Sequence, residues 1–190
     1  MPRKPYVERM AEYNRWMNVR VYAAAGRLSS EALARDRQAF FGSILGTLNH
    51  LVVADTIWLQ RFAGLPGPHA ALNPVRAMPR QVPMALDAIP FTDFDALSTH
   101  RAMLDAMIEG WVASLTEDDL QYVLHYTNTR GESFDREVFG LLMHVFNHQT
   151  HHRGQVTTLL TQAGVDVGVT DLLVLIPDVH AATDAAPHRS

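Results

Sequence analysis

The chain has 190 residues, of which 47% are hydrophobic and 19% are charged, and this suits one domain with a single hydrophobic core. It contains no cysteine, which excludes disulfide bonds, cysteine nucleophiles and thiolate metal ligands. A formal net charge of −4 and the lack of a long basic run argue against nucleic-acid binding. The start of the chain has no apolar segment like that of a signal peptide, and no stretch has the length of a membrane span. We therefore expect a cytoplasmic protein that does not bind membranes.

Four segments have apolar residues at steps of three and four, and each predicts an amphipathic helix. They are residues 5–28, 43–62, 93–115 and 136–162. Residues 64–91, between the second and third helices, contain six prolines and little periodicity. This stretch predicts a long loop that either crosses the length of a bundle or covers a site.

Residues 119–136 have a different pattern, since a run rich in β-formers at 120–126 is followed by a turn at 128–132. We interpret this as a small β-hairpin before the last helix, and we expect the apolar residues 172–176 to dock against the helices. The predicted fold is an all-α four-helix bundle with this hairpin. We expect one domain over residues 1–177 and a flexible tail over residues 178–190.

Four histidines lie close together in the last predicted helix, at positions 144, 148, 151 and 152. A helix turns by about 100° per residue, so His152 lies about 30° and His148 about 70° from the centre of the apolar stripe. His144 lies about 110° and His151 about 130° away. His144 and His152 are also about 12 Å apart along the axis, too far to share an ion. A ligand pair is therefore His144 with His148 or His148 with His152, and the facing angle favours the second pair.

A third ligand is expected from a facing helix, and His50 is the only histidine in the core of another predicted helix. His50, His148 and His152 would form a site of three neutral nitrogens for a divalent metal, with a position open to water or substrate. His144 or Arg153 could then assist catalysis beside the metal. The alternative is a metal-free bundle in which these histidines are hydrogen-bonded core residues.

Asp55 lies among apolar residues of the second helix and needs a partner if it is buried. Its candidate partners are a histidine N–H or an arginine such as Arg20 or Arg153. Arg153 and Gln155 could orient a ligand histidine or a substrate, or could equally cap contacts between helices.

Several segments together resemble a known family. Residues 13–18, YNRWMN, are similar to the Y-N-x-W-x-N signature of the DinB/YfiT-like family, damage-inducible helical bundles unrelated to the translesion polymerase of similar name. Residues 48–51 with Trp58 resemble its second-helix metal motif, and residues 147–155 resemble its N-H-x-x-x-H-R-G-Q motif. Residues 162–165 and 170–172 resemble its usual end.

The resemblance implies an up-up-down-down four-helix bundle, a homodimer, and a divalent ion (nickel, zinc or manganese) held by three histidines. By motif these are His50, His148 and His152. The family includes S-transferases and isomerases that use low-molecular-weight thiols such as mycothiol and bacillithiol. The resemblance thus implies a metal-dependent thiol S-transferase or isomerase with a small-molecule substrate. A metal-dependent hydrolase and a non-catalytic metal-binding stress-response protein are the alternatives.

Overall fold

The computed structural model describes residues 2–78 and 85–178. Residues 179–190, nearly all of the expected flexible tail, lie outside the described residues. So do residues 79–84, which include two of the six loop prolines.

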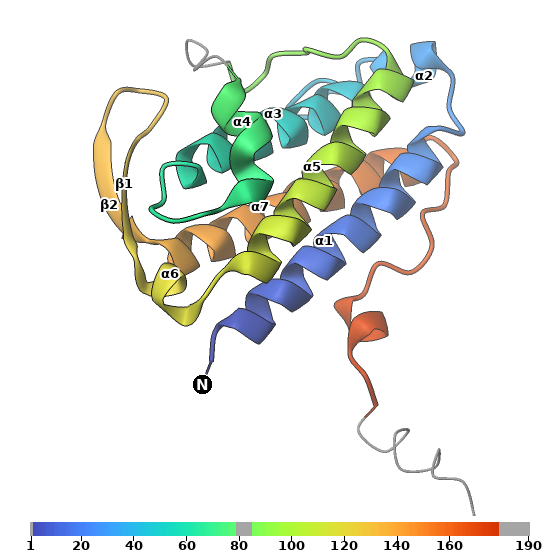
Figure 1. Ribbon diagram of the computed structural model, residues 1–190. Coiled ribbons are helices and arrows are strands. Elements are labelled where there is room, and N and C mark those ends of the chain that lie inside the picture. The colour runs from blue at the N-terminus through green and yellow to red at the C-terminus, as the bar shows by residue number, and fades with distance from the viewer. Residues whose placement is uncertain (1, 79–84, 179–190) are drawn as a thin grey trace, which may run out of the picture.

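Four long helices form the bundle that the sequence predicts: α1 (Lys4–Ala25), α3 (Ile44–Phe62), α5 (Phe94–Ser114) and α7 (Val138–Gln162), as Figure 1 shows. Side-chain caps explain where two of them begin. The Ser43 hydroxyl accepts a hydrogen bond from the Gly46 backbone N–H, and the Asp93 carboxylate accepts one from the Ala96 N–H. Within the described residues, none of the helices is both long and apolar enough to cross a membrane.

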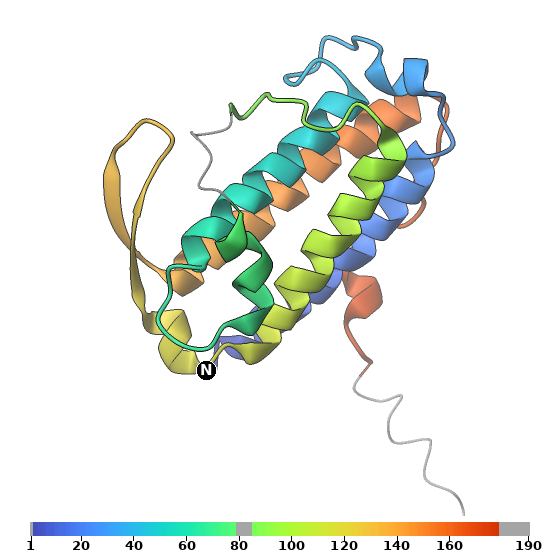
Figure 2. The ribbon, with the colours of Figure 1, turned by 45° about the horizontal axis from the view of Figure 1, so that its top comes forward.

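The directions of the helices follow from contacts near the two ends of each neighbouring pair (Figure 2). Helix α1 is parallel to α7 and antiparallel to α5, while α3 is antiparallel to α7 and parallel to α5. The contacts are Lys4 with Ala113 and Asn18 with Asp105 (α1 and α5), Tyr6 with Phe139 and Asn14 with Arg153 (α1 and α7), Trp58 with His144 and His50 with His152 (α3 and α7), and Asp55 with Arg101 and Phe62 with Trp111 (α3 and α5).

The order along the chain is therefore up-down-down-up, and the expected up-up-down-down order is wrong. An up-up-down-down bundle needs two long crossovers. Here only the chain between α3 and α5 travels the length of the bundle. The chain between α1 and α3 stays at one end, where the short helix α2 (Ser30–Ala34) packs against α3.

The crossover between α3 and α5 contains more regular structure than its composition suggests. It includes a 3-10 turn, η1 (Ala70–Leu72), and a short helix, α4 (Asn73–Ala77). Leu72 and Val75 are buried. Pro74 does not interrupt α4 because it lies in the first turn, where its missing N–H has no intrahelical partner.

The predicted hairpin is present as β1 (Val123–Thr127) paired antiparallel with β2 (Ser133–Glu137), with Val123 opposite Glu137 and Thr127 opposite Ser133. Residues 119–121, the first of the predicted hairpin, are helical instead and form the end of α6 (Glu117–Gln121). Thr116 and Asp119 form a reciprocal capping box that starts this helix. On β1, Leu124 and Tyr126 are buried against the bundle.

The apolar segment near the end forms a 3-10 turn, η2 (Leu172–Leu175), which contacts α1 as expected. The Arg9 side chain donates a hydrogen bond to the Leu175 carbonyl. Only part of the segment is covered, since Leu172 and Leu175 pack against the core while Leu173 and Val174 are exposed.

Asp55 is buried, and its partner is Arg101 of α5, 2.6 Å away between Oδ2 and Nη1. Neither Arg20 nor Arg153 is bonded to it, so both predicted arginine partners are wrong. Arg101 also forms an ion pair with Asp105 at 2.9 Å. Burial alone would lower the pKa of Arg101, but the charges of Asp105 and Asp55 raise it above its ordinary value.

We expect Asp55→Ala to lower the free energy of unfolding by about 3 kcal/mol, because it leaves part of a buried positive charge without compensation. Urea denaturation monitored by circular dichroism measures this loss. The control is Glu109→Ala, which removes the exposed Arg15–Glu109 pair and should cost less than about 1 kcal/mol. Equal losses for the two variants would contradict the assignment.

Candidate metal centre

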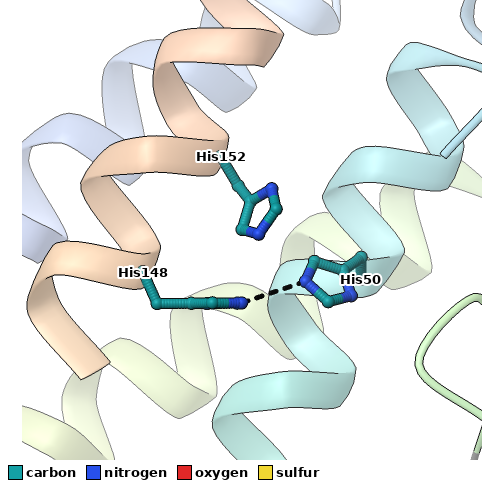
Figure 3. A group of neighbouring side chains, drawn as sticks. All are labelled: His50, His148 and His152. Carbon is teal, nitrogen blue, oxygen red and sulfur yellow. Dashed lines mark hydrogen bonds between the residues drawn. The ribbon is translucent and has the colours of Figure 1, made fainter. Parts of the chain in front are cut away.

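Three histidines face one another between α3 and α7 (Figure 3). His50 projects from α3, and His148 and His152 project from successive turns of α7. Their ring nitrogens offer one donor each within 4.8 Å of one another. The Nε2 atoms of His50 and His148 are 3.1 Å apart. Two nitrogens on one tetrahedral zinc ion lie roughly 3.3 Å apart, so this spacing is compatible with a shared ion.

The cluster is mostly shielded from solvent. His50 is 3% exposed and His152 is 8% exposed, while His148 is half-buried. The Phe41 ring stacks on the His50 ring with centroids 3.8 Å apart and meets His152 edge-on. Phe41 thus closes one side of the cluster, and the more exposed side is at His148.

Hydrogen bonds select the tautomers of two of the rings. The His50 Nδ1–H donates to the Leu86 carbonyl at 2.7 Å, because a carbonyl oxygen can only accept. The His152 Nδ1–H donates to Gln155 Oε1 at 2.8 Å, as expected for a residue that orients a ligand histidine. Both rings therefore have an unprotonated Nε2 facing the cluster, the arrangement typical of metal-binding histidines.

The electrostatic environment keeps the three rings neutral. Burial is the largest cause that lowers the pKa of each ring. The pKa of His148 falls to about 3, since His152 and His50 add repulsion to the effect of burial. Each neutral imidazole carries one proton and one lone pair, so at neutral pH the cluster can accept a cation without a net loss of protons.

The other two histidines of α7 lie outside this group. His151 is exposed, as its facing angle predicts. His144 lies beside the cluster, with its ring centroid 5.9 Å from that of His148 and 5.2 Å from that of Trp58. Its pKa is lowered by burial and by the charges of Arg136 and Arg61.

Arg153 does not lie beside the imidazoles, although it follows His152 directly. It is 2% exposed and donates hydrogen bonds to Asn14 and Asn18 of α1. Its guanidinium also lies over the Tyr13 ring, at 5.6 Å. The structure thus places Arg153 in the contact between α7 and α1, away from the position that a catalytic role beside the cluster requires.

Two groups at the cluster were not anticipated from the sequence. The Leu86 carbonyl belongs to the backbone, which has no signal in the sequence. Phe41 precedes α3 by a short turn, and only its aromatic character near a histidine-bearing helix could have suggested it.

These features define a class of protein, namely a four-helix bundle with a three-histidine cluster compatible with a metal ion between two of its helices. The model of the DinB family matches residues 1–179, so the chain belongs to the DinB family.

Two related proteins agree with this membership. Protein DinB of Bacillus subtilis (strain 168) is 27% identical over 164 residues, which cover 86% of this chain and 89% of that protein. The crystal structure of a DinB-like protein from Bacillus cereus is 22% identical and has a TM-score of 0.53, with coverage of 84% of this chain and 89% of that one. The second likeness supports the fold alone.

We expect the metal-free protein to lose stability as the pH falls below about 6.5. The unfolded chain binds protons in that range, whereas the folded cluster does not until its lowered pKa values are reached. The free energy of unfolding should therefore decrease from pH 6.5 downwards and be free of this dependence above it. Urea denaturation after chelator treatment, at several pH values, measures the slope. His148→Asn should reduce the slope and His151→Asn should not; equal slopes in wild type and His148→Asn would contradict the expectation.

Proposed function

We propose that the chain holds a divalent metal ion through His50, His148 and His152. On this basis we propose a metal-dependent S-transferase or isomerase that joins a low-molecular-weight thiol to a small-molecule substrate. The observation that supports the metal site most strongly is the convergence of three neutral ring nitrogens within 4.8 Å. We also propose a cytoplasmic location, and a homodimer as the family resemblance implies.

The donor set supports an open site rather than a closed structural one. Among the described residues, the cluster contains three donors and no fourth His, Asp or Glu. A structural zinc site normally has four protein ligands, whereas a catalytic site has three and an open position. Of the three metals that the resemblance implies, nickel and zinc suit an all-imidazole set better than manganese, which prefers oxygen ligands.

A divalent ion at this site would lower the pKa of a bound thiol or water and so supply a nucleophile at neutral pH. The surrounding residues have the supporting roles. Leu86 and Gln155 orient His50 and His152 through their Nδ1–H groups, and Phe41 shields the cluster from water on one side. Because the chain has no cysteine, the thiol in a transfer reaction would have to come from a separate molecule.

Hydrolysis is the second candidate, and the position of His144 supports it. The His144 ring lies next to His148, which is the most exposed of the three clustered histidines. Burial lowers the pKa of His144. A neutral imidazole at this place can accept a proton from an attacking water. A metal protein without catalytic activity is the third candidate.

We expect the purified protein to contain about one divalent ion per chain, and the double variant His148→Ala/His152→Ala to contain almost none. Inductively coupled plasma mass spectrometry of protein dialysed against metal-free buffer measures the content. His151→Ala is the matched control, because it removes an exposed imidazole from the same helix and should keep the ion. Equal metal content in the double variant and wild type would show that the ligands are wrongly assigned.

We expect mycothiol or bacillithiol to coordinate to the cobalt-loaded protein as a thiolate. The thiolate should produce a new ligand-to-metal charge-transfer band in the absorption spectrum, which water cannot produce. The spectrum of the His148→Ala/His152→Ala variant with the same thiol provides the control. A cobalt-loaded protein whose spectrum does not respond to either thiol would count against the transferase and leave hydrolysis as the leading candidate.

A further inference from the structure

A large cleft lies along α3, lined by the hairpin on one side and by Met78 and the end of the crossover on the other. Its volume of about 710 Å³ is in the range of small-molecule sites. Its walls are mainly apolar and come from several elements. They include Val53 and Ile57 of α3, Met78 after α4, Phe91 of the crossover, and Leu124 and Tyr126 of β1.

The charge in this cleft is concentrated at one point. Arg61 lines it, and no aspartate or glutamate is among the described lining residues. The Arg61 guanidinium lies 4.5 Å from the ring centroid of Trp58 and 5.0 Å from that of Tyr126. The aromatic rings hold the guanidinium in place and leave its N–H groups free, since in the described parts of the chain its side chain has no hydrogen bond or ion pair. His125 also lines the cleft, and its ring is already bonded to the Asp135 carboxylate.

The cleft and the histidine cluster lie on the same face of α3. Val53 follows His50 by one turn, and Ile57 and Arg61 continue at steps of four. Arg61 is eleven residues after His50, which places it about 16 Å further along the axis and only about 20° around it. None of the three clustered histidines lines the cleft, but its nearer end begins one turn from His50.

The crossover connects the same two places. Leu86 holds the His50 ring through its carbonyl, and Phe91, five residues later, forms part of the cleft wall. Asn49, which precedes His50, donates a hydrogen bond to the Phe91 carbonyl and accepts one from the Phe91 N–H. The segment that orients a candidate metal ligand is therefore fixed to the wall of the cleft.

We propose that the cleft binds the substrate of the metal centre, and that this substrate is an organic anion with an extended apolar body. Its anionic group pairs with Arg61, the apolar body lies along Val53, Ile57 and Phe91, and the opposite end points towards His50. The link to the metal centre rests on the proposed function. The recognition of an organic anion does not, because Arg61 and the apolar walls form that part of the site without a metal.

Calorimetry with the metal-free protein tests the anion site by itself. Decanoate, decanol and decylammonium have the same apolar body and differ in charge. Decanoate should bind at least about tenfold more tightly than decylammonium, the effect expected for one charge-assisted contact. Arg61→Gln should remove this preference, whereas Arg130→Gln, at an exposed arginine of the hairpin turn outside the lining, should keep it.

Ile57→Trp should weaken binding of both decanoate and decanol, because the larger side chain fills the cleft, while Ile57→Val should have little effect. Circular dichroism and thermal unfolding of each variant confirm that it is folded. The proposal is overturned if Arg61→Gln binds decanoate as wild type does, or if decylammonium binds equally well.

Proton relaxation of bound decanoate tests the orientation. In cobalt-loaded protein, compared with zinc-loaded protein, the terminal methyl protons should relax faster than those next to the carboxylate, because the methyl end is nearer the paramagnetic ion. The reverse order, or no difference between the two metals, overturns the link to the metal centre. If no cobalt binds at all, the proposed function fails, and the calorimetry still decides the anion site.

Discussion

A buried ionic cluster sets the relative positions of the four long helices. Arg101 of α5 pairs with Asp55 of α3 and with Asp105 of its own helix, and Asp105 accepts a hydrogen bond from Asn18 of α1. Arg153 of α7 completes the set by bonding to α1. Buried charges are costly unless they are paired. Sliding any helix along its neighbour would separate these pairs and destabilise the bundle. The three imidazoles can meet only when α3 and α7 are in the register that these bonds maintain.

Adjacent residues of α7 serve different purposes. His152 and Arg153 are one position apart, and the helix turns by about 100° between them, so one faces α3 and the other faces α1. His152 joins the imidazole cluster while Arg153 fastens α7 to Asn14. The segment of residues 147–155 that resembles a metal motif therefore contains both candidate ligands and a structural anchor. The resemblance at residues 13–18 includes the other side of this contact, since Asn14 and Asn18 accept the hydrogen bonds from Arg153.

The helices and the histidine cluster could be predicted because their signals are local. Apolar periodicity defined the four helices, and helix geometry alone favoured His148 with His152. The partner of Asp55 could not be found this way, because it depends on which helix packs beside α3. The direction of the helices was missed for a related reason, since periodicity does not show whether a connection stays at one end of a bundle or crosses it. Short helices such as α4 and α6 lack the length for a periodic signal and depend on local caps.

The hydrogen bonds of His50 and His152 also bear on how a metal would enter and leave. Both rings already have their Nδ1–H bonded and their Nε2 unprotonated, so neither has to rotate or release a proton when an ion arrives. The remaining histidine, His148, is the least buried of the three and contacts His50 through Nε2. That contact has to open, and because His50 Nε2 is unprotonated, His148 donates the proton across it and has to shift this proton to Nδ1. Exchange of the ion would then be governed by the motion of one side chain at the solvent edge, and the rate of metal uptake could be altered at His148 without disturbing the fixed pair behind it.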